Sequence, residues 1–310
     1  MKLTQLGYVA AIARQGSLRA AARHLGVAQP AFSRSIAELE RELGAPLFER
    51  RARGMIATPL GEAFLRRANA ILNDVRRAQE EFEQLKTGGG GAGEITIGLS
   101  IAAHLQLLPG ALRPFRDRYP KVRLHVIEGF YPTLAPSLQD GSVDFYIGPD
   151  PGLRLPAILK KETLLSGRRA VLCRMKHPLA GATSLGALRD AEWITTSITP
   201  KAENEIGDVF RRYRLPEPKL VLRSQSALTL LTCLTNSDLL AMAPPQWVDS
   251  PIANQLLRTI AVREELSAVS IIVVTRRDVP LSPAANLLLD IMKRAAAHSI
   301  SPPAPRGFRR

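Results

Sequence analysis

The polar side chains between residues 29 and 35 have the types and spacing that suit contacts with DNA. Gln29 can pair bidentately with adenine, and Arg34 can form a two-pronged contact with guanine. Gln29 and Ser33 lie one helical turn apart, as do Pro30 and Arg34, opposite a stripe of apolar residues. The hydroxyls of Ser33 and Ser35 suit phosphate oxygens. A merely solvated polar face is the alternative interpretation.

A second basic group follows at Arg51 and Arg53. The segment from Leu47 to Ala57 has apolar ends around a basic, glycine-containing middle, which predicts two short strands joined by a hairpin. Arginines at such a tip can contact the DNA backbone or enter a minor groove. Ordinary solvated arginines are the alternative at this place.

Three helices must hold these side chains. Apolar residues recur at helical spacing in each, and Gly16, Gly26 and Gly44 end them in turn. Ser17 is an N-cap for the second helix, and Pro30 lies in the first turn of the third. With the hairpin as a wing, residues 1–58 are predicted to form a winged helix-turn-helix.

Thr58-Pro59 begins a long helix, predicted over 59–87. Its apolar residues recur with alternating spacings of four and three, as in a heptad seam: Phe64, Ala68, Ile71, Val75, Ala78, Phe82 and Leu85. At 1.5 Å per residue the stretch is roughly 42 Å long, too long for a small wing domain to cover. We therefore expect a homodimer through this seam. Packing of the stripe on its own domain is the alternative.

Residues 88–93 form a glycine-rich hinge. Their glycines fit the dinucleotide pattern G-x-G-x-x-G, but the segment follows a helix and precedes a strand-like run. A dinucleotide fingerprint needs the opposite order, so this match is spurious.

From residue 94 on, strand-like runs alternate with helical stretches, which predicts α/β organisation. The order of the runs predicts an effector-binding domain over 94–300 with two lobes around a cleft. The first lobe takes about 94–163 and 268–300 and the second about 164–267. A basic, proline-rich tail, 301–310, is read as solvated.

Small polar residues occur where a predicted strand ends and a helix begins. Such junctions favour anions, because backbone N–H groups and the helix dipole point there. The candidates come from both lobes: Ser100, Thr196, Ser197, Thr199 and Ser226. For each of them, a plain helix cap is the alternative role.

Composition narrows the class of protein. Lys and Arg number 42 against 28 Asp and Glu, a net charge of +14, which favours a polyanionic partner. The only cysteines, Cys173 and Cys233, exclude a disulfide framework and fit a cytosolic protein. The sequence contains no uninterrupted apolar stretch of about 18 residues, so no membrane-spanning helix is indicated. The five histidines lack metal-ligand spacing, and no catalytic constellation is present, so we expect no enzyme, no metal and no cofactor.

The motifs resemble those of the LysR-type transcriptional regulators. The resemblance rests on Gly16 to Glu40, on Leu-Gly-Ala-Pro-Leu-Phe-Glu-Arg at 43–50 and on Thr-Pro-Leu-Gly-Glu at 58–62. It implies a multidomain α+β fold whose effector domain is similar to periplasmic binding proteins. Three residues depart from the usual pattern: Arg19, Ala28 and Phe32. The side chain of Ala28 cannot cap the recognition helix, which costs about 1 kcal/mol.

The resemblance also implies a cytoplasmic bacterial protein whose partners are double-stranded promoter DNA and a small-molecule effector. It points to a tetramer built from two dimers and admits RNA polymerase as a further partner. It places effector contacts near Ser100 and Ile101 and aromatic walls at Phe130 or Tyr131. Residues 131–145 and 213–220 look like the toluenesulfonate-responsive subgroup, which favours an aromatic acid or another small anion.

Two other classes of protein compete with this interpretation. A binding protein or enzyme with a helical dimerisation module would leave Gln29, Arg34 and the 51–53 arginines without a role. A nonspecific architectural DNA binder would have no use for a two-lobed cleft. Salt-dependent binding that still ranks DNA sequences would separate a regulator from an architectural protein.

Overall fold

The computed structural model describes residues 1–310 except 53, 88–91, 197–199, 268, 278 and 300–310. The N-terminal head contains helices α1 (Leu3–Gln15), α2 (Leu18–His24) and α3 (Gln29–Leu43) and strands β1 (Phe48–Arg51) and β2 (Gly54–Ala57). The strands pair antiparallel as a wing, and the apolar faces of the helices meet in one core. Ser17 caps α2 through the Ala20 N–H, whereas Ala28 gives α3 no side-chain cap.

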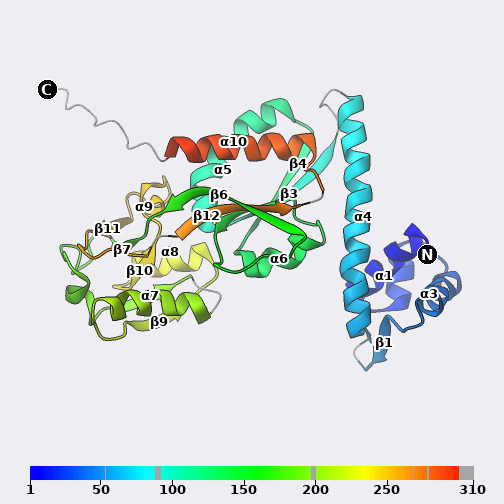
Figure 1. The fold of residues 1–310 in the computed structure, drawn as a ribbon, viewed down its shortest axis with the longest axis horizontal. Helices are drawn as coiled ribbons and strands as arrows, with labels where there is room; N and C mark the ends of the chain where they lie inside the picture. The colour runs from blue at the N-terminus through cyan, green and yellow to red at the C-terminus, as the bar shows by residue number, and fades with distance from the viewer. Residues whose placement is uncertain (53, 88–91, 197–199, 268, 278, 300–310) are drawn as a thin grey trace.

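Helix α4 (Pro59–Lys86) stands between the head and the rest of the chain (Figure 1). The Thr58 hydroxyl caps it by accepting from the Gly61 N–H at 2.9 Å. Its first turns pack on the head, and its middle lies beside α6 (Tyr131–Gln139).

The first lobe holds a five-stranded sheet in the order β4-β3-β5-β12-β6. Its strands are β3 (Gly93–Leu99), β4 (Val122–Glu128), β5 (Phe145–Pro149), β6 (Leu159–Gly167) and β12 (Val269–Arg276). β3 is parallel to β4 and β5, and β12 is antiparallel to β5 and β6. Helices α5 (Ile101–Arg118) and α10 (Pro283–Ser299) pack together over one core of the lobe, and α6 covers another.

The second lobe holds a sheet in the order β11-β7-β10-β8-β9. Its strands are β7 (Ala170–Arg174), β8 (Glu192–Thr195), β9 (Lys219–Arg223), β10 (Leu240–Ala243) and β11 (Leu257–Ile260). Its helices are α7 (Pro200–Arg212), α8 (Ala227–Asn236) and the short α9 (Gln246–Asp249), with a 3-10 turn at Leu185–Leu188.

The fold class expected from the sequence is therefore confirmed. β6 was not predicted, because its exposed Lys160, Lys161 and Glu162 obscure the strand pattern. The chain crosses between the lobes after Gly167, later than the predicted boundary at 163, and returns between β11 and β12.

Candidate DNA-reading surface and effector cleft

The exposed face of α3 is the candidate reading surface. Gln29, Pro30 and Arg34 are exposed, while Ser33 and Ser35 are half-buried. The backbone carbonyl of Ser35 accepts from the Gln5 side chain, which ties α3 to α1.

The opposite face of α3 fixes how the helix sits. Phe32 is fully buried, and its ring lies 4.6 Å from that of Tyr8. Phe32 is larger than the residue usual in the family at this position, and the core of the head accommodates its side chain. The uncapped start of α3 leaves its first backbone N–H groups available.

At the wing, Arg51 is exposed and forms a 2.6 Å ion pair with Glu49 on the same strand. Arg53 lies outside the described residues. Arg50 is also exposed on β1 and was not among the predicted contacts.

The predicted dimer seam divides into two parts. Phe64 packs on the core of the head, and Ala68 is 1% exposed. These two residues are therefore packed within their own chain. Val75 is half-buried, whereas Ile71, Ala78 and Phe82 are exposed, Phe82 at 65%. The alternative of packing within one chain therefore holds for the start of the seam only.

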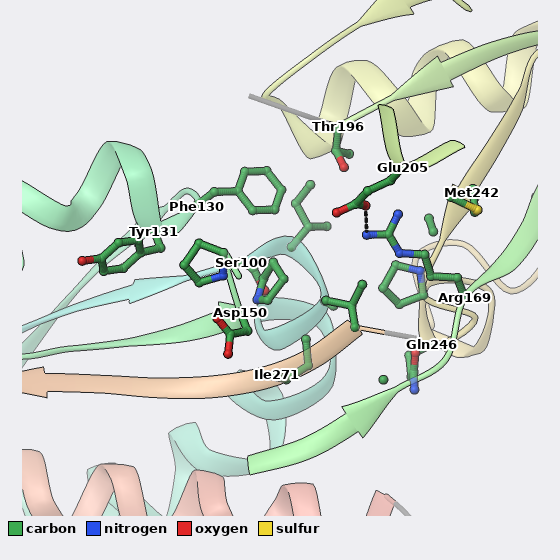
Figure 2. Close-up of a pocket in the computed structure, with 18 of the residues that line it drawn as sticks. Ser100, Phe130, Tyr131, Asp150, Arg169, Thr196, Glu205, Met242, Gln246 and Ile271 are labelled. Carbon is green, nitrogen blue, oxygen red and sulfur yellow. Dashed lines mark ion pairs between the residues drawn. The ribbon is translucent and has the colours of Figure 1, made fainter. Parts of the chain in front are cut away.

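A cavity of about 550 Å³ lies between the lobes (Figure 2). Its walls are mainly apolar and come from segments far apart in sequence: Ile101, Phe130, Leu153, Leu165, Met242, Trp247 and Ile271. Ser100 lies at its base, 2% exposed, where its hydroxyl caps α5 by accepting from the Ala103 N–H at 3.4 Å.

The sequence-predicted effector residues fall into three groups. Ser100, Ile101, Phe130, Tyr131 and Thr196 line the cavity. Ser197 and Thr199 lie outside the described residues, and Ser226 is not in the lining. The Phe130 ring points toward the other lining residues of the cavity, but the Tyr131 ring points away from them (Figure 2).

The predicted roles of the Tyr131 ring and of Ser226 therefore need correction. Tyr131 is 6% exposed and packs in the core under α6 beside Tyr146, so its ring is no cavity wall. Ser226 caps α8, accepting from the Thr229 N–H. A carboxylate from the first lobe already stands at that helix start, because Glu128 accepts from the Ala227 N–H at 3.2 Å.

Sequence reasoning missed the charged residues of the cleft. Arg169 forms an ion pair with Glu205 of α7, and Asp150 is paired with Lys161 at 2.7 Å. Arg168 is exposed, lines the same cavity and has no ion pair within the described part of the chain. The signal available beforehand was the pair Arg168-Arg169 at the crossing between the lobes.

Within the described residues, no group of three His, Cys, Asp or Glu side chains is placed to hold a metal ion. The same part of the chain contains no helix long and apolar enough to cross a membrane.

A winged head, a long linker helix and a two-lobed domain with a cavity between its lobes define the class of ligand-responsive DNA-binding proteins. Two family models match the chain: "Bacterial regulatory helix-turn-helix protein, lysR family" over residues 3–62 and "LysR substrate binding domain" over residues 88–297. The chain therefore belongs to the LysR family of transcriptional regulators, with a DNA-binding head and an effector-binding domain.

Curated relatives share this organisation. The chain is 23% identical to the HTH-type transcriptional regulator TdcA of Escherichia coli K12, covering 93% of this chain and 91% of TdcA. It is 27% identical to GbpR of Azospirillum brasilense, covering 96% of this chain and 87% of GbpR. It is 34% identical to BudR of Raoultella terrigena over a shorter stretch, 62% of this chain and 66% of BudR.

Solved structures show the same fold. CbnR, a LysR family transcriptional regulator, superposes with a TM-score of 0.68 at 20% identity, covering 96% of this chain and 99% of CbnR. Full-length OxyR from Pseudomonas aeruginosa gives 0.67 at 21% identity, covering 96% and 94% of the two chains. A full-length CbnR complexed with its target DNA also gives 0.67, at 20% identity, covering 95% and 100%.

Proposed function

We propose that the protein binds promoter DNA as a dimer. Binding of a small organic anion in the interlobe cleft changes how the dimer is positioned on the DNA. The observation that carries the proposal is the cleft itself. A mainly apolar cavity holds one cationic side chain, Arg168, without an ion-pair partner among the described residues.

The proposed DNA contacts follow from exposure. Gln29 and Arg34 reach base edges in the major groove, because they project from the uncovered face of α3. Ser33, Ser35 and the backbone N–H groups on either side of Pro30 donate to phosphates, and the wing with Arg51 and Arg53 follows the neighbouring DNA backbone.

The proposed dimer uses the exposed part of the seam on α4. Large apolar side chains such as Ile71 and Phe82 are stabilised when a second helix covers them, and Val75 and Ala78 lie on the same stripe. The structure with target DNA is a CbnR complex, so pairing of two heads on an inverted repeat is our inference for this chain. A tetramer of two dimers stays a prediction.

The proposed ligand class follows from the lining. An aromatic carboxylate or sulfonate would place its ring against Phe130, Trp247 and Ile271 and its anionic group near Arg168 and the start of α5. The hydroxyl of Ser100 and the side chain of Thr196 come from opposite lobes. A ligand bound by both lobes favours the closed arrangement over an open one, which shifts the equilibrium between them.

The experiment combines an operator with a panel of acids. A duplex selected by the protein from a random DNA pool serves as the operator. Benzoate and p-toluenesulfonate, with neutral benzamide as control, are titrated by calorimetry into wild type and Ser100→Val. We expect the anions to bind wild type, the variant to bind them about tenfold more weakly, and operator affinity without ligand to be equal in both.

Two results would contradict the proposal. Benzamide binding as well as benzoate would remove the anion from the ligand class. Equal benzoate affinity in wild type and Ser100→Val would remove Ser100 from the site.

Phe82→Asp tests the dimer. Since Phe82 is exposed in the single chain, the substitution leaves the fold intact and places two like charges in the seam. Sedimentation should show a lower mass with weaker operator binding. Thr87→Asp, just beyond the seam, is the control and should leave the mass unchanged.

A further inference from the structure

The middle of α4 is fixed to the first lobe by a cluster of charged and polar groups, which we call the clasp. Its α4 members are Asn73, Asp74 and Arg77, and its lobe members are Asp140, Gly141, Asp144 and Arg276. Two guanidinium groups are involved, and both are largely buried: the side chains of Arg77 and Arg276 are 9% and 8% exposed.

Each arginine crosses between α4 and the lobe. Arg77 pairs with the Asp144 carboxylate at 2.9 Å and donates to the Gly141 carbonyl at 2.7 Å. Arg276 makes a two-pronged contact with Asp74, at 2.6 and 3.0 Å. Such paired, planar contacts fix orientation as well as distance.

The lobe side of the clasp is preorganised. Asp144 also accepts from the Thr96 backbone N–H at 2.8 Å, which holds its carboxylate at the edge of the sheet. Gly141 has φ +74°, a conformation that favours glycine, and a Cβ there would lie 2.6 Å from an Arg276 nitrogen and push on that side chain. Burial raises the pKa of the Asp144 carboxyl, while the Arg77 guanidinium acts to lower it.

Three elements of the lobe run from the clasp to the effector cleft. Asp144 directly precedes β5, and Pro149 and Asp150 at the far end of that strand line the cavity. Arg276 ends β12, while Val269 and Ile271 near its start line the cavity. The two strands pair with each other along this length, about 17 Å for five residues.

The third element is α6. It starts beside the cavity at Phe130 and Pro132 and ends at Asp140, whose carbonyl accepts from Asn73 at 2.8 Å. Closely packed strands and helices move as a unit. A shift of these elements at the cavity end therefore also displaces their ends at the clasp.

We infer that the clasp is the mechanical connection between the effector cleft and the DNA-bearing helix α4. The inference rests on the proposed function, because it assigns the route by which a ligand in the cleft acts on DNA. Arg77 and Arg276 are positioning residues in this scheme. Movement of β5, β12 and α6 displaces the lobe members of the clasp, and α4 follows because its Arg77 and Asp74 are ion-paired with two of them.

Hydrogen exchange of the full-length protein, followed by mass spectrometry, tests the clasp without any ligand. Asp74→Asn removes the charge that holds Arg276, and the position is 38% exposed, so the amide is hydrated without loss of the helix. We expect exchange to rise about tenfold at residues 73–77 and also at the cavity ends of α6 and β5, 130–133 and 149–153.

Glu83→Gln is the matched control. It also turns an acid of α4 into an amide, but its ion pair with Lys86, at 3.8 Å, is exposed and lies within α4 itself. Its exchange pattern should match wild type at the cavity ends. Gly141→Ala, which pushes on Arg276 while keeping every charge, should reproduce the Asp74→Asn pattern.

Adding the selected operator duplex tests the coupling in the other direction. In wild type, DNA bound at the head should change exchange at 130–133 and 149–153, and in Asp74→Asn this change should be lost. Increased exchange confined to 73–77 would overturn the clasp as a connection. An equal increase in β11, remote from clasp and cavity, would overturn it too, since the residues would then only stabilise the fold.

The outcomes separate this inference from the proposed function. Suppose that increased exchange is confined to 73–77 and that benzoate binds normally. The clasp would then be rejected as a connection, and the cleft would remain the proposed anion-binding site. Suppose instead that exchange rises at the cavity ends as well and that neither anion binds. The proposed ligand class would then be rejected, and the clasp would remain the connection between cleft and α4.

Discussion

The head and the effector cleft present charged side chains in different ways. On α3, Gln29 and Arg34 stand exposed on a helix whose other face is locked in a core. In the cleft, Arg169 is paired with Glu205 and Asp150 with Lys161. DNA can thus be read without exchanging partners, whereas a ligand that approaches Arg169 or Asp150 must compete with ion pairs within the protein. This difference suits a protein with a rigid DNA-binding head and an effector domain whose contacts change when a ligand binds.

The largest expected effect concerns the rigidity of the head. A Cβ on Gly61 would overlap the Leu47 backbone carbonyl, which cannot move without shifting the wing. Gly61→Ala should lower the free energy of unfolding by about 3 kcal/mol and abolish operator binding. Thermal unfolding followed by circular dichroism measures the loss.

Gly7→Ala is the control for this prediction. Gly7 lies inside α1, and an added Cβ meets nothing within 4 Å. Higher helix propensity should therefore stabilise the head by about 1 kcal/mol. Destabilisation by both substitutions would show that the head is not selectively tight around Gly61.

The next effect concerns base reading. Arg34→Ala should weaken operator binding by about 1 to 3 kcal/mol and relax discrimination at one base position in each half-site. Arg51→Ala, at the wing, should lower affinity with little change in base preference, because the contact that we propose for Arg51 is with the DNA backbone. Competition with point-mutated operators distinguishes the two, and an unchanged ranking by Arg34→Ala would remove this residue from base reading.

A smaller effect concerns the competed ion pair of the cleft. If a ligand anion takes the place of Glu205 on Arg169, Glu205→Gln should tighten benzoate binding and Arg169→Gln should weaken it, each by about fivefold after screening by solvent. A pair with a purely structural role would give changes of the same sign. Calorimetric titration of both variants therefore decides between the two roles.

The smallest effect concerns Cys173, which is fully buried on β7. Burial raises the pKa of its thiol above the ordinary value, against weaker opposing effects of Arg258 and Arg174. At neutral pH the thiol stays protonated, so iodoacetamide should leave Cys173 unmodified in the native protein and react with it in denaturant. Peptide mass mapping gives the answer, and rapid native labelling would indicate an accessible thiolate.

Much of the head could be read directly from the sequence. Glycine stops, the Ser17 and Thr58 caps and the apolar stripe of α3 are local signals, and each acts within a few residues of the group that it controls. The exposure of Gln29 and Arg34 follows from the same periodicity, since the apolar side of a helix determines its opposite side.

The cleft and the clasp were decided by tertiary structure. Ser100 was found because a strand-to-helix junction marks it locally, but the pairing of Arg169 with Glu205 joins the connection between β6 and β7 to a helix of the second lobe. Arg276 meets Asp74 across 202 positions of sequence. No periodic pattern encodes such a contact, because it depends on how β12 and α4 are brought together by the packing of the whole lobe.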